Sequence, residues 1–270
     1  MDEAVHFPIG TNMDSYVVQK RLSMAVYGDV VLACAAANNP VAIKRLDVNA
    51  TLGHVSFQRA RVPTTKDFER ELEVYEYLGR AGGHGNIVQF IETFEHFGYY
   101  HLVLEHCADG SLVDKTLSAQ QLLLLFTQLL DAISFLHAHG IAHGDIAPSN
   151  VLCHGQATYK LCDFGSAIVL ANCTSDEAAA HRLRDLQALG SLVAAYLQGA
   201  AFTNGLESRR KRRGSAPAPL VLSQLLEFIR VAPQLSAMEL LVQWQRSCSS
   251  VHESSVCRPL KTRRVFIDAL

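Results

Sequence analysis

His143-Gly144-Asp145-Ile146-Ala147-Pro148-Ser149-Asn150 is the stretch of sequence that decides the fold. It places a carboxylate, Asp145, five residues before an amide, Asn150. Such a pair can hold a hydroxyl group and a hard cation at one point, because the carboxylate can orient or deprotonate a nucleophile while the amide oxygen binds the metal. Taken alone, the stretch also fits a turn rich in Asp and Asn. Its interpretation therefore depends on the motifs on either side.

Charged motifs flank this stretch in both directions. Downstream, Asp163-Phe164-Gly165 follows the strand-like residues 159–162, and its carboxylate is suited to binding magnesium. Upstream, Val41-Ala42-Ile43-Lys44 is an apolar strand that ends in a lysine. This lysine could meet phosphate oxygens if a carboxylate, for which Glu71 is the candidate, held its side chain. Alone, Asp163-Phe164-Gly165 would be a common turn, and Lys44 would be a solvated residue at the end of a strand. The interpretation therefore depends on the order in which the motifs occur along the chain.

The hydrophobic pattern of the first hundred residues predicts strands with one helix. Strands are expected at 16–18, 30–33, 41–44, 87–94 and 99–105, where β-branched and apolar residues form short runs. Between them, a helix is predicted over 66–78, because apolar side chains recur there at helical spacing: Phe68, Leu72, Tyr75 and Leu78. The block is therefore expected to form a sheet that carries one helix.

After residue 107 the pattern becomes helical. Ser118 followed by Gln121 has the spacing of a capping box and predicts a helix that ends near Gly140. Further helical patterns occur at 185–197, 220–229 and 236–244. The sequence thus predicts an α+β chain, with a strand-rich N-terminal lobe joined to a helical C-terminal lobe near residue 107.

Taken together, the motifs resemble the protein-kinase family. The matches are the strand lysine of VAIK, the loop HGDIAPSN in place of H-R-D-x-x-x-x-N, and DFG. Residues 70–72, 84–88, 102–105 and 185–190 add similarity to the helix-C glutamate, HPNIV, hinge-strand and helix-F regions. The resemblance covers roughly 16–244 and implies a divergent, serine/threonine-like kinase with a bilobal fold. The expected divisions are an N-terminal extension (1–15), an N-lobe (16–106), a C-lobe (107–250) and a C-terminal tail (251–270).

The resemblance also implies a set of site residues. ATP and Mg²⁺ are the expected cofactors, with Mn²⁺ as an alternative metal. Asp145 would align the acceptor hydroxyl, and Lys44 would hold the α- and β-phosphates while paired with Glu71. Asn150 and Asp163 would bind the metal. The adenosine part of the nucleotide would contact residues of both lobes and the hinge: Leu22, Gly28, Val30, Ala42, Glu105, Cys107 and Leu152.

The sequence departs from the family pattern at several points. The glycine-rich loop is Ser23-Met24-Ala25-Val26-Tyr27-Gly28 and keeps only its last glycine. Gly144 replaces the loop arginine that commonly receives a phosphorylated activation loop, and Ala147 replaces the lysine expected beside the γ-phosphate. Between Asp163 and Asp185 the chain is short for an activation segment, and it contains no A-P-E. These changes predict weaker nucleotide binding, slower phosphoryl transfer and no control by loop phosphorylation.

Composition limits the classes of partner and compartment. Lysine and arginine total 24 against 26 acidic residues, so a nucleic-acid-coating protein is not expected. The seven cysteines contain no CxxC pair, which favours a reducing compartment. The start of the chain is acidic, and the most apolar run, 122–130, is too short for a bilayer span. We therefore expect an intracellular protein with no membrane partner, in the cytoplasm and, if the basic run 209–213 acts in import, the nucleus.

Three functions remain open at this point. An active serine/threonine kinase acting on protein substrates explains why Lys44, Glu71, Asp145, Asn150 and Asp163 all occur together. A pseudokinase scaffold or regulator that binds nucleotide weakly would explain the altered glycine-rich loop and Ala147. A small-molecule kinase of the same superfamily would explain the HGD motif and the short segment before residue 185.

Overall fold

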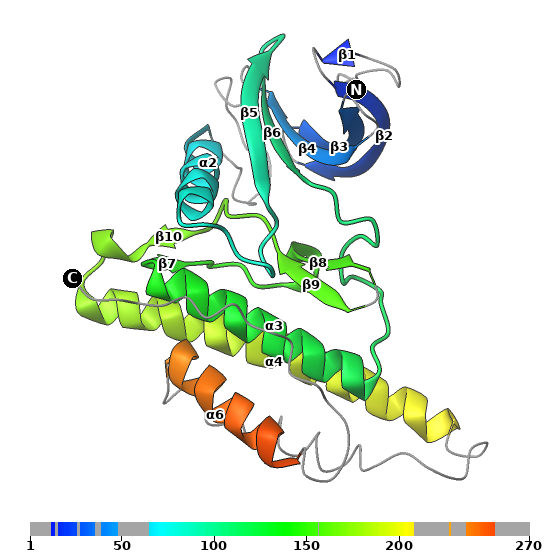
Figure 1. Cartoon of the computed structure of the whole chain (residues 1–270), viewed down its shortest axis with the longest axis vertical. Coiled ribbons are helices and arrows are strands. Elements are labelled where there is room, and N and C mark those ends of the chain that lie inside the picture. Colours follow the sequence, from blue (N-terminus) through cyan, green and yellow to red (C-terminus); the bar gives the residue numbers. More distant parts are fainter. Residues whose placement is uncertain are drawn as a thin grey trace, which may run out of the picture.

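The architecture follows from a computed structural model of the chain (Figure 1). It describes residues 12–13, 16–25, 28–35, 39–47, 65–155, 157–207, 227 and 236–251. The basic run 209–213 lies outside the described residues, as do most of the helix expected at 220–229 and nearly all of both terminal segments. The interpretations made for those parts stay predictions.

The N-terminal part is an antiparallel sheet with one helix beside it. Its strand order is β1-β2-β3-β4-β6-β5. The strands are β1 (Asn12–Met13), β2 (Tyr16–Ala25), β3 (Gly28–Ala35), β4 (Pro40–Asp47), β5 (Phe90–His96) and β6 (Tyr99–Glu105). Helix α2 (Thr65–Arg80) packs beside β5 (Figure 1). The strand expected from residue 87 begins at Phe90 instead, because Ile87 leaves the sheet to bridge Leu161 in the other lobe.

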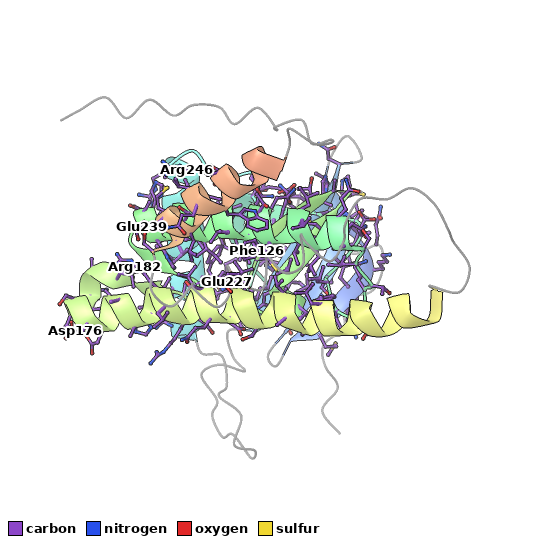
Figure 2. All side chains as sticks on the ribbon, turned by 90° about the horizontal axis from the view of Figure 1, so that it is seen from below. Phe126, Asp176, Arg182, Glu227, Glu239 and Arg246 are labelled. Carbon is purple, nitrogen blue, oxygen red and sulfur yellow. The ribbon has the colours of Figure 1, made fainter. Side chains whose placement is uncertain are left out.

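The C-terminal part is helical, with two short two-stranded antiparallel sheets above it. Its helices are α3 (Ala119–Ala138), α4 (Ser175–Glu207) and α6 (Ala237–Val251), and α3 packs against both of the others (Figure 2). One sheet pairs β7 (Ile141–Ala142) with β10 (Ile168–Val169), and the other is the hairpin of β8 (Val151–His154) and β9 (Thr158–Leu161). Two single-turn 3₁₀ helices, Pro148–Asn150 and Leu170–Asn172, complete the loops. The two-lobed α+β arrangement expected from the sequence is confirmed.

Helix α3 forms the core of the C-terminal lobe. The capping box is confirmed, because Ser118 Oγ accepts the Gln121 N–H at 3.3 Å and Gln121 Oε1 accepts the Ser118 N–H at 2.9 Å. Gly140, with φ +72°, follows its last turn. The helix is long and apolar enough to cross a membrane by length and composition, but 56% of that stretch is buried inside the protein. This burial is typical of a core helix.

Helix α4 begins ten residues earlier than the pattern indicated. The expected start was Asp185, but the helix starts at Ser175. Thr174 explains the difference, because its hydroxyl accepts the Glu177 N–H at 3.4 Å while the Glu177 carboxylate accepts the Thr174 N–H at 2.9 Å. This second capping box starts a helix that the apolar periodicity alone does not reveal. Asp176 in its first turn lies at the far end of the lobe (Figure 2).

A buried histidine in β6 predicts acid sensitivity of the N-terminal lobe. His101 has no exposed surface and stacks on Phe94 at 4.6 Å. Burial lowers its pKa to about 4, with Arg45 adding to the effect. Because the folded protein binds this proton more weakly than the unfolded chain, stability should fall as pH drops from about 6.5 towards 4, by up to roughly 3 kcal/mol.

The measurement is urea unfolding as a function of pH, on the wild type and on a His101→Gln variant. We expect the stability of the wild type to fall more steeply than that of the variant over this interval. Parallel curves for the two proteins would contradict the role given to His101.

Candidate active site

Three charged residues from distant parts of the chain meet in one cluster. Lys44 on β4 donates from Nζ to Glu71 Oε2 at 2.7 Å and to Asp163 Oδ1 at 3.0 Å. Glu71 lies on the buried face of α2, and Asp163 follows β9. The structure thus confirms the contact expected between Lys44 and Glu71, and it adds a contact of Lys44 with Asp163, which the sequence proposed only as a metal ligand.

The electrostatics of this cluster favour a charged lysine. Burial acts to lower the pKa of Lys44, but the carboxylates of Glu71 and Asp163 raise it above its usual value overall. Burial likewise opposes ionisation of Asp163, yet the Lys44 ammonium lowers the pKa of that carboxyl. Asp163 therefore carries its negative charge at neutral pH. Its carboxylate can bind a second cation in addition to the Lys44 ammonium.

Asp145 and Asn150 lie together in the loop after β7. Asn150 Nδ2 donates to the Asp145 carbonyl oxygen at 2.9 Å and to its carboxylate Oδ2 at 2.8 Å. Asp145 is exposed, whereas Asn150 is buried at the end of a 3₁₀ turn that Pro148 begins. The amide therefore fixes the direction of an accessible carboxylate, as a residue that orients an acceptor hydroxyl requires.

Asp185 holds the same loop from below. This buried residue of α4 accepts the backbone N–H groups of His143 and Gly144, both at 2.9 Å, and contacts His137 Nε2 at 2.9 Å. The sequence placed Asp185 in a family motif but assigned it no role in the site. The sequence feature that could have singled out Asp185 is a carboxylate at the start of an apolar helical pattern. Its contacts with the loop are formed only in the folded protein.

A column of aromatic rings connects the sheet to the loop. Phe90 on β5 stacks with Tyr75 of α2 at 6.3 Å between ring centres, and Tyr75 meets Phe164 edge to face at 4.9 Å. Phe164 lies 5.1 Å from His143, whose pKa is lowered by burial. The column fixes α2, and with it Glu71, relative to the loop that carries Asp145. Helical periodicity predicted only that Tyr75 is buried.

The segment after Asp163 is short and tied to the catalytic loop. Strand β10 pairs with β7, and the Leu170 N–H donates to the Gly140 carbonyl at 2.7 Å. Gly144 has φ +80°, and a Cβ atom there would lie 2.4 Å from the carbonyl oxygen of Ser166. Backbone contacts therefore hold this segment in place where the family commonly uses an arginine and a phosphate.

The residues expected to contact the nucleotide lie on the inner strands and near the hinge. Val30 pairs with Lys44 and with Ser23, and Ala42 pairs with Leu104. Leu22 lies at an irregularity of the β2–β3 register and is 41% exposed.

The last glycine of the altered loop has a steric reason to be glycine. A Cβ atom at Gly28 would lie 1.8 Å from the Arg45 carbonyl oxygen. The Ser23 and Ala25 replacements lie on β2, which pairs with β3 up to Gly28. The described residues of the altered loop, 23–25 and 28, are therefore paired strand residues of β2 and β3.

The hinge is fixed by a salt bridge between the lobes. Glu105, at the end of β6, contacts Lys160 Nζ of β9 at 2.8 Å and accepts the Gln89 N–H at 3.1 Å. Cys107 is buried two residues later. Leu152, on β8, forms a bridge with Ser111. These contacts place three of the residues expected to bind the nucleotide around the connection between the lobes: Glu105, Cys107 and Leu152. The sequence did not predict the contact of Lys160 with Glu105.

The donor set in this site fits a hard divalent cation. Asp163 and Asn150 offer the carboxylate and amide oxygens that Mg²⁺ accepts, and Lys44 supplies an ammonium group for phosphate oxygens. The Asp163 side chain is 43% exposed, so its carboxylate is open to a second cation.

Comparison with known proteins gives one family and many relatives. Residues 16–184 match the family model of the protein kinase domain. A probable myosin light chain kinase of Dictyostelium discoideum is 34% identical over 120 residues, which cover 41% of this chain and 30% of that protein. Serine/threonine-protein kinase ksp1 of Schizosaccharomyces pombe is 30% identical over 166 residues, 56% of this chain and 33% of that protein. The chain thus spans about a third of the length of these curated relatives.

Proposed function

The chain belongs to the protein kinase family, and from that premise we propose that it transfers the γ-phosphoryl group of ATP to serine or threonine residues of protein substrates. The observation that supports this proposal is the contact of Lys44 with both Glu71 and Asp163, beside a loop in which Asn150 orients Asp145. Lys44, Glu71, Asp145, Asn150 and Asp163 are all present, and Lys44 contacts Glu71 as expected, although the lysine expected at position 147 is replaced by alanine.

Each of these residues has a distinct part in the reaction. Lys44, held by Glu71, binds the α- and β-phosphates, and Asp145 orients the acceptor hydroxyl and takes its proton. Asp163 and Asn150 hold the divalent cation, which when bound neutralises charge on the phosphates. We propose Mg²⁺ for this role because both ligands are hard oxygen donors, with Mn²⁺ as a substitute.

One observation favours a second candidate, a kinase for small molecules. Helix α4 begins at Ser175, so only eleven residues separate Asp163 from the helix. The described residues of this segment form β10 and a single 3₁₀ turn, without a further platform for an extended peptide. A compact acceptor would fit such a site, so substrate class must be decided by experiment.

The decisive experiment is transfer of radiolabelled phosphate from ATP with Mg²⁺ or Mn²⁺. Acceptors should include basic and acidic proteins and a set of small hydroxyl compounds, with Asp145→Asn as the control. We expect label in protein serine or threonine and its loss in the control. Incorporation that survives the substitution would overturn the proposal, and label only in small molecules would establish the second candidate.

Nucleotide binding can be measured separately from catalysis. Because a ligand that binds the folded state raises its stability, Mg²⁺ with ATP should increase the melting temperature. Lys44→Met should reduce this shift, because it removes the cation that meets the phosphates. No shift at saturating nucleotide with either metal would leave the chain a pseudokinase that acts as a scaffold.

Activity should not require phosphorylation of the segment before α4. Thr174 caps this helix through Glu177, and β10 is already paired with β7, so the segment is ordered without a phosphate. We expect phosphatase-treated protein to keep its activity. Thr174→Ala should cost about 1 kcal/mol of stability through the lost cap, with kcat nearly unchanged. Loss of most activity after phosphatase treatment would contradict this expectation.

A further inference from the structure

Three side chains with metal-binding atoms converge at the hinge, and the proposed phosphoryl transfer gives none of them a catalytic role. Glu105 ends β6, Cys107 follows two residues later, and His154 ends β8. Their carboxylate, thiol and imidazole atoms all lie within 4.8 Å of one another. The connection that leaves β6 passes beside the β8–β9 hairpin, which brings residues about 50 positions apart together (Figure 1).

The combination of ligands favours zinc over the metal of the active site. Cysteine, histidine and a carboxylate are the three kinds of side chain that bind Zn²⁺ in proteins, whereas Mg²⁺ and Ca²⁺ take oxygen ligands. Tetrahedral zinc with bonds of about 2.0–2.3 Å needs ligand atoms roughly 3.3–3.8 Å apart. The observed separations, up to 4.8 Å, therefore require a contraction of about 1 Å.

The surroundings of the three ligands allow such a contraction. His154 is exposed at the end of its strand, so its ring can turn towards the other two, while Cys107 is buried and fixed. The cysteine thus supplies a rigid ligand and the histidine a mobile one. Burial, with Glu105 adding to it, raises the pKa of the Cys107 thiol to about 12, so metal binding must release this proton to solvent.

The salt bridge between Glu105 and Lys160 competes with the metal without excluding it. Lys160 Nζ lies 2.8 Å from each carboxylate oxygen, and the Gln89 N–H donates to Oε2 at 3.1 Å. A carboxylate accepts about four hydrogen bonds or ligands, so Oε2 can keep both protein partners while Oε1 turns to a metal.

We propose that Glu105, Cys107 and His154 bind one Zn²⁺ ion, which ties the hinge to β8 and fixes the two lobes relative to each other. Glu105 belongs to the last strand of the N-terminal sheet and His154 to the C-terminal lobe. A metal shared by these residues therefore restricts movement at the hinge, where adenine is expected to bind. The site goes beyond the proposed phosphoryl transfer, and its metal binding does not depend on it.

Cobalt binding to the full chain tests the site directly, because a thiolate ligand gives Co²⁺ a characteristic charge-transfer absorption that Zn²⁺ abolishes. We expect this band in the wild type, and at least a tenfold loss of Co²⁺ and Zn²⁺ affinity in Cys107→Ala and His154→Gln. Cys173→Ala and His181→Gln are the matched controls, since they remove the same groups elsewhere and should bind as the wild type does. Unchanged affinity in both site variants, or no thiolate band, would overturn the proposal.

A second measurement tests the effect on the hinge. The KM for ATP is compared with saturating Zn²⁺ and with a zinc chelator, for the wild type and for His154→Gln. We expect Zn²⁺ to change the KM of the wild type and not that of the variant, while the two proteins are equally active with the chelator. Equal responses would show that the metal does not act at this hinge. Because cobalt binding is measured without ATP, failure of the kinase function would leave that test intact.

Discussion

Replacing Gly144 with alanine should lower kcat by at least about 100-fold, because it displaces the loop that carries the catalytic aspartate. Gly144 has φ +80°, and an added Cβ atom would lie 2.4 Å from the Ser166 carbonyl oxygen, a backbone atom that cannot rotate away. Either the loop or the segment after the DFG motif must move. The neighbouring Asp145 or Asp163 then leaves its position relative to the substrate.

A matched glycine separates this steric effect from backbone strain. Gly155, in the turn between β8 and β9, has φ +65°, but an added Cβ atom there would meet no atom within 4 Å. Gly155→Ala should therefore cost only the left-handed strain, roughly 1–2 kcal/mol of stability, and leave kcat nearly unchanged. Equal kcat losses in the two variants, measured at a temperature where both are folded, would contradict the steric explanation for Gly144.

The same contact explains why the family arginine is absent from this loop. An arginine at position 144 would need the space that the Ser166 backbone occupies, so Gly144→Arg should inactivate the protein rather than add a regulatory site. The sequence indicated that an arginine and its phosphate had been lost. The structure adds the physical reason, which is that the short segment packs directly on the loop.

Motifs that depend on local spacing could be predicted from the sequence. The capping box of Ser118 and Gln121 is set by neighbours three residues apart, and the helical spacing over 66–78 located α2, which carries Glu71. The order of the lysine, loop and DFG motifs then limited how the two lobes could assemble, and Lys44 does contact Glu71 and Asp163.

Contacts between backbones of distant segments could not be predicted in this way. The clamp of Asp185 on the loop joins residues about 40 positions apart, and the Gly144–Ser166 contact involves a carbonyl that every residue type possesses. Neither leaves a period or a motif in the sequence. The early start of α4 had a local signal, the spacing of Thr174 and Glu177, but the apolar pattern used to find helices does not register a cap.

Introducing a lysine at Ala147 should accelerate the chemical step. Ala147 lies two residues after Asp145, where most relatives are expected to carry a lysine beside the γ-phosphate. A positioned charge at the transition state is worth a few kcal/mol, on the order of tenfold to a thousandfold in rate. Ala147 is half-buried in an extended conformation just before Pro148, so a longer side chain can be added without breaking the 3₁₀ turn.

The control for this variant is Ala147→Met, which adds comparable length without the charge. Single-turnover phosphorylation separates the chemical step from product release, so it is the measurement to compare. We expect Ala147→Lys to raise the single-turnover rate more than it lowers the KM for ATP, and Ala147→Met to raise neither. A matched gain in the methionine variant would assign the effect to packing. No gain in the lysine variant, with its fold intact, would contradict this prediction. It would mean that the protein compensates elsewhere, for which Arg182 and Arg184 near the start of α4 are candidates, or that it does not transfer phosphate.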